Sequence, residues 1–289
     1  MDRTNTRIID GKAHAAAIRA DAAKTIAAAL SSASLTAPHL AVVLMGSDPA
    51  SQVYIKGKQT ACEEVGIDFT LHNLPEDASE AELLARIDTL NEDKDISGIL
   101  IQQPLPKHIN KYAVVSRVNA AKDVDCLHPH NIGLVAAGLG NILPCTPAGI
   151  VTLLKRENIE MAGKHAVIVG RSDVVGKPLA FMLLANDATV TICHSKTKHL
   201  LEICRQADIL IAAVGIPQHI AADFVKQDAV IIDVGVNRIA PKKVCGDVDY
   251  DAVQGIASYI TPVPGGVGPM TVATLMENCV KAWKIQNGI

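Results

Sequence analysis

Short apolar runs alternate with helical patterns along almost the whole chain. The strands predicted in the first half are 39–46, 68–74 and 96–101, and the helices are 11–32, 52–66 and 79–91. A run that is apolar at nearly every position, such as HLAVVLMG at 39–46, is typical of a strand buried on both faces. Strands that alternate with helices imply right-handed βαβ crossovers and a parallel sheet.

A second series of the same kind begins at His165. Its predicted strands are 165–170, 188–194, 207–215 and 229–235, and its helices lie near 178–186, 198–206 and 221–227. Between the two series, the segment Asn141–Gly149 (NILPCTPAG) contains two prolines that interrupt regular structure. The length of 289 residues also favours more than one domain. We therefore predict an α/β protein with a first domain over 1–143, a second over 144–268, and a last helix over 269–289 that packs back on the first.

The most informative connection is the stretch AVIVGRSDVVGKP at 166–178. An apolar strand runs into Gly170, and Gly176 opens an amphipathic helix. Glycines let the backbone approach an anion closely, and the unpaired N–H groups of a first helical turn attract phosphate. The familiar dinucleotide fingerprint has three glycines, whereas this turn has two. The βα units that follow favour dinucleotide binding over an ordinary turn.

The end of the next strand favours NADP over NAD. In NAD-binding domains an Asp or Glu at this position binds the ribose 2′-hydroxyl. Here the strand ends in His194-Ser195-Lys196-Thr197, without a carboxylate that would repel a 2′-phosphate. Arg171 and Ser195 offer that phosphate a guanidinium and a hydroxyl. The alternative is that Arg171 is a solvated loop residue.

Composition narrows the range of functions. A net charge of −3 without a basic block, and 3% aromatic residues, argue against a nucleic-acid surface. No apolar run reaches the ~18 residues of a membrane span, and no secretory pattern is present, so we expect a cytoplasmic protein without membrane contact. Seven dispersed cysteines indicate reduced thiols. His128-Pro-His130 lacks further ligands at metal spacing, so we expect no metal.

Polar residues gather where the strands of the first domain end. Tyr54 and Lys58 are four residues apart and share a helix face, whereas Lys56 points elsewhere. Asp123 and Asp125 lie in a polar loop. Ligands of parallel sheets bind beyond the carboxyl ends of strands, so we expect a cleft between the domains. The segment PGGVGP at 264–269 is either a ligand clamp with exposed amides or a glycine-rich turn between domains.

Several of these stretches resemble one family over nearly the whole chain and in the same order. The stretches are YIKGK at 54–58, GILIQQPLP at 98–106, KDVD at 122–125, PCTPAG at 144–149, VIVGRSDVVGKP at 167–178, TVTICHSKT at 189–197, DVGVN at 233–237, GDVD at 246–249 and PVPGGVGPMT at 262–271. They are similar to the bifunctional methylenetetrahydrofolate dehydrogenase/methenyltetrahydrofolate cyclohydrolase family. Two positions depart from it: Gln103 replaces the expected leucine, and Cys126 replaces the expected glycine.

The resemblance implies a fold and an activity. It implies an N-terminal folate-binding catalytic domain and a C-terminal Rossmann-like NADP-binding domain, with NADP-dependent oxidation of 5,10-methylenetetrahydrofolate followed by hydrolysis to 10-formyltetrahydrofolate. A formate ligase is not expected, because no phosphate loop of the GxxxxGK[ST] type is present. A homodimer that acts on small tetrahydrofolate derivatives in one-carbon metabolism is expected.

The resemblance also assigns the site. It makes Lys58 the main catalytic residue, Gln102 its partner, Tyr54 a group that packs against the substrate ring, and Asp125 the pterin anchor. The residues assigned to NADP are Gly170, Arg171, Ser172, Gly176, Ser195 and Val236. The further residues assigned to the folate are Ile101, Gln103, Pro264, Gly265, Gly266, Val267 and Gly268.

The residue types agree with this chemistry. A lysine whose pKa is lowered by partial desolvation can move protons in both directions, as the hydrolysis requires. An ionised Asp125 can accept two hydrogen bonds from an amino-pyrimidine edge. Two other hypotheses remain open from sequence: a shikimate-type NADP dehydrogenase, and a dinucleotide-binding sensor without catalysis.

Overall fold

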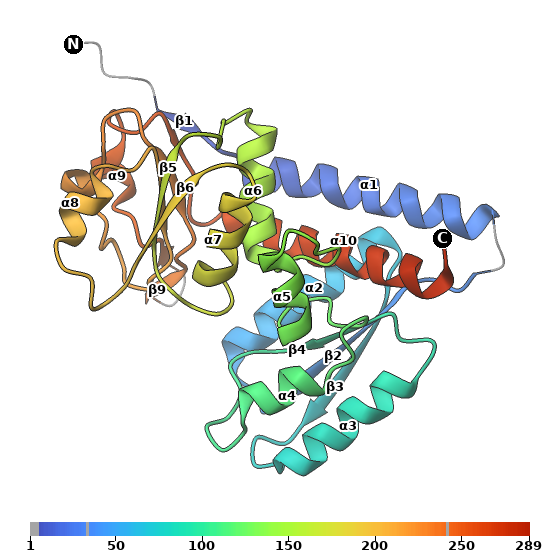
Figure 1. Cartoon of the computed structure of the whole chain (residues 1–289). Helices are drawn as coiled ribbons and strands as arrows, with labels where there is room; N and C mark the ends of the chain where they lie inside the picture. Colours follow the sequence, from blue (N-terminus) through green and yellow to red (C-terminus); the bar gives the residue numbers. More distant parts are fainter. Residues whose placement is uncertain (1–5, 33–34, 241–242) are drawn as a thin grey trace. The chain divides into compact units, whose positions relative to one another are not determined.

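The computed structural model describes residues 6–32, 35–240 and 243–289 of the chain (Figure 1). Contacts divide this part of the chain into two compact units, each built on its own parallel sheet. Unit 1 comprises the described residues up to Ala15 and Thr146–Thr271, and unit 2 comprises Ala16–Cys145 and Val272–Ile289. The long helices α1 (Gly11–Ser32) and α10 (Val267–Asn287) each begin in unit 1 and continue in unit 2.

Unit 2 contains a three-stranded sheet in the order β3-β2-β4, and its neighbouring strands are parallel. Its strands are β2 (His39–Met45), β3 (Asp68–Leu74) and β4 (Gly98–Ile101). Its shorter helices are α2 (Pro49–Val65), α3 (Glu80–Glu92), α4 (Lys111–Arg117) and α5 (Pro129–Ala136). The central strand β2 is buried along almost its whole length, as its apolar sequence predicts.

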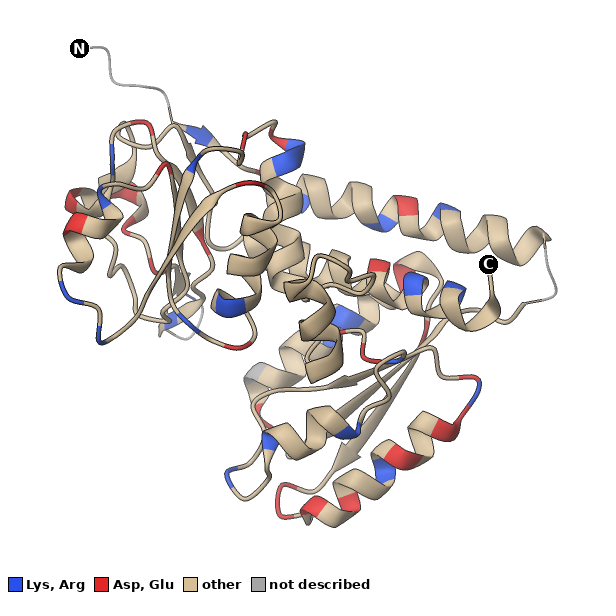
Figure 2. Ribbon diagram, viewed as in Figure 1, with Lys and Arg blue, Asp and Glu red and all other residues tan. Residues whose placement is uncertain are grey.

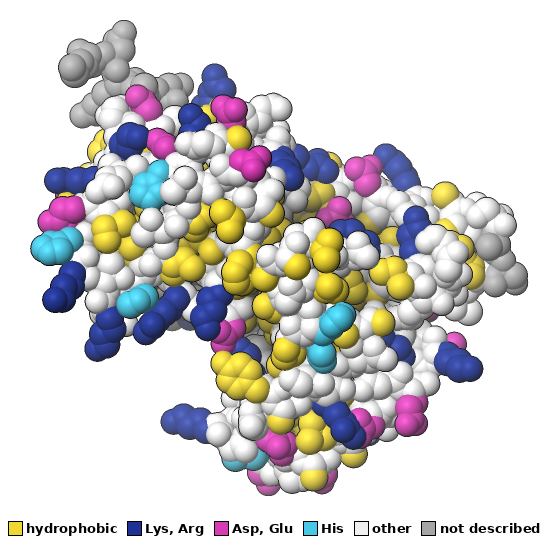
Figure 3. Space-filling model, in the orientation of Figure 1, with side chains coloured by type: hydrophobic (Ala, Val, Ile, Leu, Met, Phe, Trp, Pro, Cys, Tyr) yellow, Lys and Arg dark blue, Asp and Glu magenta, His cyan; other side chains and the backbone are white. Residues whose placement is uncertain are grey.

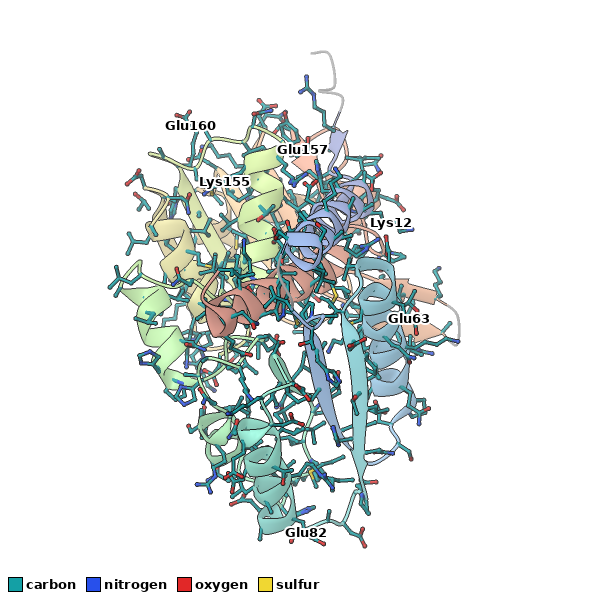
Figure 4. The ribbon with its side chains drawn as sticks, turned by 90° about the vertical axis from the view of Figure 1, so that its right-hand side faces the viewer. Lys12, Glu63, Glu82, Lys155, Glu157 and Glu160 are labelled. Atoms are coloured by element: carbon teal, nitrogen blue, oxygen red, sulfur yellow. The ribbon has the colours of Figure 1, made fainter. Side chains whose placement is uncertain are left out.

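The helices of unit 2 begin and end at residues with clear local roles. The Asp48 carboxylate caps α2 by accepting from the Ser51 N–H at 2.8 Å, and α2 ends at Gly66, which has a left-handed backbone. Ser79 and Glu82 form a capping box at the start of α3, where Glu82 is labelled in Figure 4. Further acidic residues lie along α3 (Figure 2). The buried face of α3 packs against the sheet through Leu83, Ile87 and Leu90.

The second half of α10 is tied to unit 2 by buried polar contacts. The Trp283 indole donates to the Thr36 carbonyl at 3.0 Å, and the Gln286 amide donates to the Ser97 carbonyl at 2.8 Å. Trp283 is 2% exposed and is one of the largest buried side chains. This part of α10 therefore belongs to the core of the unit that holds β2 and β4.

Unit 1 contains a six-stranded sheet in the order β1-β11-β8-β7-β5-β6, with all neighbours parallel. Its strands are β1 (Arg7–Ile8), β5 (His165–Val169), β6 (Thr189–Cys193), β7 (Ile209–Ala212), β8 (Val230–Asp233) and β11 (Tyr259–Ile260). An antiparallel pair, β9 (Asn237–Ala240) and β10 (Lys243–Cys245), lies outside this sheet. The helices are α6 (Cys145–Arg156), α7 (Gly176–Leu184), α8 (Leu200–Cys204) and α9 (Tyr250–Val253).

The predicted helix near 221–227 is wrong. The segment contains only the three-residue 3₁₀ turn η1 (Ala222–Phe224). The residue directly before the segment is paired elsewhere, since the Ile220 N–H donates to the Asp247 carbonyl and the Ile220 carbonyl accepts from the Asp249 N–H, both at 2.9 Å. An extended bridge to the 247–249 segment thus replaces helical hydrogen bonds. The last helix also begins earlier than predicted, at Val267.

One pair of side chains fixes the start of α1 within unit 1. The His14 Nε2 atom lies 2.7 Å from the Glu157 carboxylate, which follows α6 (Figure 4). The described helices do not include one that is both long and apolar enough to cross a bilayer.

Candidate active site

The central contact of unit 2 joins the predicted catalytic lysine to its predicted partner. The Lys58 Nζ atom donates to the Gln102 Oε1 atom at 2.9 Å, across 44 positions of sequence. Lys58 projects from α2, and Gln102 directly follows β4, where its N–H donates to the Val43 carbonyl at 2.9 Å. Gln102 is 8% exposed, so this contact is largely protected from solvent. Tyr54 lies one turn before Lys58 and is 53% exposed.

The surroundings of Lys58 favour its neutral form more than water does. Burial lowers the pKa of the Lys58 ammonium group, and the negative charge of Asp125 opposes part of this change. Two neighbouring thiols, Cys62 and Cys145, also have their pKa values raised by burial, Cys62 to about 12. These thiols are neutral near pH 7, so Asp125 is the neighbour whose charge acts on Lys58 there. The lysine can therefore exchange a proton more readily than a solvated one.

Asp125 lies on a loop that is held at three points. The buried Lys122 donates from Nζ to three backbone carbonyls at the end of α3, including those of Leu90 at 3.1 Å and Asn91 at 2.9 Å. The Asp123 carboxylate accepts from the His128 N–H at 2.8 Å. The amide of Asn278 on α10, which is fully buried, donates to the Val124 carbonyl at 2.9 Å. The loop therefore presents Asp125 on a fixed backbone.

The Cys126 departure changes the backbone next to Asp125. Cys126 has φ 56°, in the left-handed region that a glycine adopts without a steric cost. A side chain there costs about 1–2 kcal/mol. The Cys126 thiol is fully buried and donates to the Ile142 carbonyl at 3.3 Å, which offsets part of this cost. The loop keeps the turn expected of a glycine and gains a link to the 142 segment.

The histidines at 128 and 130 serve a local structural purpose. His128 is the N-cap of α5, and its Nδ1 atom accepts from the His130 N–H at 3.1 Å. Asp123 also fixes the His128 backbone, as described above. This use of the ring nitrogen explains the His-Pro-His pattern without a metal ion.

In unit 1, the two glycines of the 166–178 stretch are required by close backbone contacts. Gly170 has φ 136°, and a Cβ atom there would collide with the Ala213 carbonyl. A Cβ atom at Gly176 would collide with the Gly170 carbonyl. The Ser172 hydroxyl accepts from the Val175 N–H at 3.1 Å and closes the turn before α7. The result is a compact turn with bare backbone at a helix start, which fits a bound phosphate.

The predicted 2′-phosphate residues lie at the ends of neighbouring strands. Arg171 follows β5 and Ser195 follows β6, and these strands pair in parallel up to Val169 and Cys193. Both side chains are exposed. The turn that carries Ser195 is closed by the His194 N–H, which donates to the Thr197 hydroxyl at 2.8 Å. The Arg171 guanidinium and the Ser195 hydroxyl are therefore accessible at the carboxyl ends of the strands.

Two buried carboxylates bind backbone N–H groups at the carboxyl ends of β7 and β8, and neither was given a role from the sequence. Asp247 accepts from the Val214 N–H at 2.7 Å and the Gly215 N–H at 2.9 Å, just beyond β7. Asp233, at the end of β8, accepts from the N–H groups of Asp247 at 2.9 Å and Val248 at 3.0 Å. Burial raises the pKa of Asp233 to about 6. The sequence does hint at these buried carboxylates. Asp233 of the DVGVN motif directly follows an apolar strand, and Asp247 of the GDVD motif lies between Gly246 and Val248.

Of the remaining predicted residues, Ile101 ends β4 and Gln103 follows Gln102, both in unit 2, whereas Val236 and 264–268 lie in unit 1. Val236 follows β8 and is 52% exposed. The 264–268 segment follows β11, and its Gly266 N–H donates to the Pro262 carbonyl at 2.8 Å. Gly266 also lies against Gly11, where a side chain would collide with the Gly266 carbonyl. Val267 and Gly268 form the first turn of α10, so their segment is a helix start.

The chain matches two family models that together span most of its length. Residues 9–125 match the catalytic domain of tetrahydrofolate dehydrogenase/cyclohydrolase, and residues 144–287 match its NAD(P)-binding domain. A bifunctional FolD protein of Bacillus cytotoxicus is 55% identical over 247 residues, which cover 86% of each chain.

Solved structures agree with this match. The FolD methylenetetrahydrofolate dehydrogenase/cyclohydrolase of Campylobacter jejuni has a TM-score of 0.95 and 46% identity, and covers 98% of this chain and 100% of its own. The Trypanosoma brucei enzyme, crystallised with NADP and an inhibitor, has a TM-score of 0.95 and 35% identity over 99% of both chains.

Shikimate dehydrogenases are only distantly similar to this chain. A shikimate dehydrogenase of Aquifex aeolicus has a TM-score of 0.54 at 14% identity, over 88% of this chain and 93% of its own, which shows a shared fold alone. The much higher identities above, over nearly the full length of both chains, decide between the two families. The chain belongs to the tetrahydrofolate dehydrogenase/cyclohydrolase family.

Proposed function

We propose that the protein oxidises 5,10-methylenetetrahydrofolate to the 5,10-methenyl compound with NADP and hydrolyses this compound to 10-formyltetrahydrofolate. The observation that carries the proposal is the Lys58–Gln102 hydrogen bond of 2.9 Å beside the charge of Asp125. The family match supplies the substrate class, and the Campylobacter jejuni and Trypanosoma brucei proteins described above carry both activities in their names.

Lys58 is the proton-transfer group of the hydrolysis in this proposal. Water adds to the cationic carbon between N5 and N10 of the folate, and neutral Lys58 accepts a proton from it. The resulting ammonium returns a proton to N5 as the bond from carbon to N5 breaks, and the new hydroxyl on that carbon loses its proton to solvent as the formyl C=O bond forms, so one proton is released overall. Gln102 accepts from Lys58 in either protonation state, because an amine and an ammonium both have N–H groups.

Asp125 orients the pterin ring. An ionised carboxylate accepts two parallel hydrogen bonds, which matches the 2-amino group and N3–H of a pterin. Its loop is fixed by Lys122, Asp123 and Asn278, so little conformational entropy is lost when the ring binds. Tyr54 offers an exposed aromatic ring one helical turn from Lys58, and a planar substrate ring can pack against it.

Unit 1 holds the cofactor in this proposal. The residues are Gly170, Arg171, Ser172, Gly176 and Ser195. Bare backbone at Gly170 and Gly176 fits the pyrophosphate, and Arg171 with Ser195 binds the 2′-phosphate. When bound, NADP supplies the hydride acceptor. This chain contributes orientation, and the hydride transfer requires no acid or base.

We also propose that the protein is a homodimer that associates through unit 1. The strand β6 is at the edge of the six-stranded sheet, with backbone groups available for pairing. Next to it, Leu184 is 62% exposed and Phe181 and Ile192 are each 38% exposed. Figure 3 shows hydrophobic side chains gathered on this face of unit 1. Light scattering tests the proposal, and Leu184→Lys with Ile192→Lys is expected to give monomers.

A coupled assay tests the proposed reactions. NADP reduction is followed with 5,10-methylenetetrahydrofolate, and loss of the methenyl compound is followed separately without cofactor. Shikimate with NADP is the control substrate and is expected to give no reduction. Binding of folate and NADP without turnover in either assay would leave a ligand-binding sensor as the better explanation.

A further inference from the structure

Two buried side-chain polar atoms have no hydrogen-bond partner among the residues that the structure describes: Nε2 of Gln103 and Oγ1 of Thr274. A threonine hydroxyl can rotate towards a carbonyl of its own helix, so its lack of a partner is easily relieved. An amide nitrogen carries two N–H groups in a fixed plane. A buried one without an acceptor loses its hydrogen bonds to water and gains none, which costs free energy.

The Gln103 backbone carbonyl belongs to the same hydrogen-bonded group as the catalytic lysine. Gln102 accepts from Lys58 at 2.9 Å through Oε1 and donates to the Gln103 carbonyl at 2.7 Å through Nε2. The backbone of Gln103 is therefore held by the side chain that also holds the lysine. Both hydrogen-bonding atoms of the Gln102 amide are used, whereas Nε2 of Gln103 is buried with its donors unused.

The pterin proposed to bind here has an acceptor beside the groups that Asp125 binds. Asp125 accepts from the 2-amino group and N3–H, which are both donors. The adjacent 4-oxo oxygen is an acceptor and is repelled by a carboxylate, so it needs a donor of its own. Lys58 already donates to Gln102 and is assigned to proton transfer in this proposal. Nε2 of the adjacent Gln103 is a buried donor without a hydrogen-bond partner among the described residues.

We propose that Gln103 is a specificity-determining residue whose Nε2 atom donates to the 4-oxo oxygen of the pterin ring. This inference rests on the proposed function. It assigns to Gln103 the discrimination between 4-oxo pterins and 4-amino pteridines, because a 4-amino group would place donor against donor. In the ligand-free protein the unpaired amide reduces stability, and substrate binding removes that cost.

The test compares Gln103→Leu with Gln59→Leu. Gln59 is an exposed glutamine of α2 in the same unit, and it donates to Glu63 at 3.1 Å; Glu63 is labelled in Figure 4. Three quantities are measured for each protein: the thermal midpoint without ligand, the Kd of 5,10-methenyltetrahydrofolate, and the Kd of a 4-amino analogue with the same side chain. Wild-type turnover is measured first. Wild-type protein that binds no folate overturns both the proposed function and this inference.

The expected result is a pair of opposite changes. Gln103→Leu weakens binding of the 4-oxo folate by about 10-fold or more, raises the ligand-free midpoint, and strengthens binding of the 4-amino analogue, because one of the two opposed donors is removed. Gln59→Leu changes none of these. A residue that only supports the fold would lower the midpoint and weaken both ligands together.

Further results contradict the inference while leaving the proposed function intact. One is a wild-type enzyme that turns over folate but whose Gln103→Leu variant binds the 4-oxo folate equally well, which means that the amide is served by a water molecule. Another is a Gln103→Glu variant that binds the 4-oxo folate like wild type, because glutamate replaces the donor by an acceptor. Gln103→Met provides the same readout if the leucine variant does not fold.

Discussion

Replacing Lys58 by methionine removes the amine and keeps an unbranched side chain of similar length. The substitution deletes the hydrogen bond to Gln102 and the positive charge that faces Asp125. We expect hydrolysis of the methenyl compound to be nearly abolished and folate binding to remain measurable. Lys56→Met is the matched control, because Lys56 is an exposed lysine two residues away on the same helix.

The size of the effect follows from the role of the lysine. A positioned acid–base group contributes about 10²- to 10⁴-fold to a rate. This range corresponds to about 3–5 kcal/mol of activation free energy. Binding loses less, since Asp125 and the ring contacts of Tyr54 remain. The result is a large loss of kcat for hydrolysis with a small change in folate Kd.

The pH dependence has a definite sign. Burial lowers the pKa of Lys58, so the hydrolysis rate is expected to rise with pH through a midpoint below the ordinary lysine value of 10.5. Between the lowered pKa of Lys58 in the native protein and the ordinary value of 10.5, Lys58 is more fully protonated in the unfolded chain than in the native one. The unfolding free energy of wild type therefore rises with pH in that window. Lys58→Met loses this dependence.

The assay follows the methenyl absorbance without cofactor, across pH, for wild type, Lys58→Met and Lys56→Met. Full hydrolysis by Lys58→Met would refute the role of the lysine in proton transfer. Equal losses in both variants would show a helix defect in place of a catalytic one.

Three further substitutions test other parts of the account. Arg171→Ala is expected to raise the KM for NADP by about 10- to 100-fold and that for NAD by less than about 2-fold, since one charge-assisted bond to the 2′-phosphate is worth about 1.5–3 kcal/mol; equal changes for both cofactors would remove Arg171 from this role. Gly176→Ala is expected to weaken NADP binding at least about 10-fold while cofactor-free hydrolysis continues, because the new Cβ collides with the Gly170 carbonyl; unchanged NADP titrations would contradict the phosphate turn. Asp233 has a pKa raised to about 6, so the native state binds its proton more tightly, and the unfolding free energy of wild type is expected to fall relative to that of Asp233→Asn by up to about 3 kcal/mol as pH rises from 4 to 7; a difference between the two proteins that is the same at both pH values in urea unfolding would refute this.

The parts of the structure that depend on local sequence were predictable. The apolar strand before Gly170 and the helix after Gly176 form as expected, because the glycine turn and the hydrophobic pattern act within a few residues. The cap residues before α2 were also recognisable, although the helix begins at Pro49, three residues before the predicted start at 52. In these segments, local preferences and tertiary packing favour the same conformation.

Long-range pairing was not predictable from the pattern. β1 contains only Arg7 and Ile8, and it forms because Arg7 pairs with Tyr259, 252 positions away. The segment around Ile220 appeared helical, but its backbone pairs with residues 247–249. Neither arrangement leaves a periodic signal in a short stretch. Both therefore required the structure.

Some residues of the candidate site could be predicted from the sequence, and others could not. Residue spacing indicated that Tyr54 and Lys58 share a face, whereas the pairing of Lys58 with Gln102 came from the family resemblance. The buried Asp247 carboxylate and the unpaired Gln103 amide became visible only through their hydrogen bonds or the lack of them. A polar residue in an apolar motif is the one sequence signal that such groups leave.

The most direct test of the central claim uses one preparation of wild-type protein. 5,10-Methylenetetrahydrofolate is supplied with NADP or with NAD, and both the reduced cofactor and 10-formyltetrahydrofolate are quantified over time. The account predicts rapid NADP reduction, slower NAD reduction, and 10-formyltetrahydrofolate as the final folate. Absence of reduced cofactor and of the formyl product, with both ligands shown to bind, would contradict it.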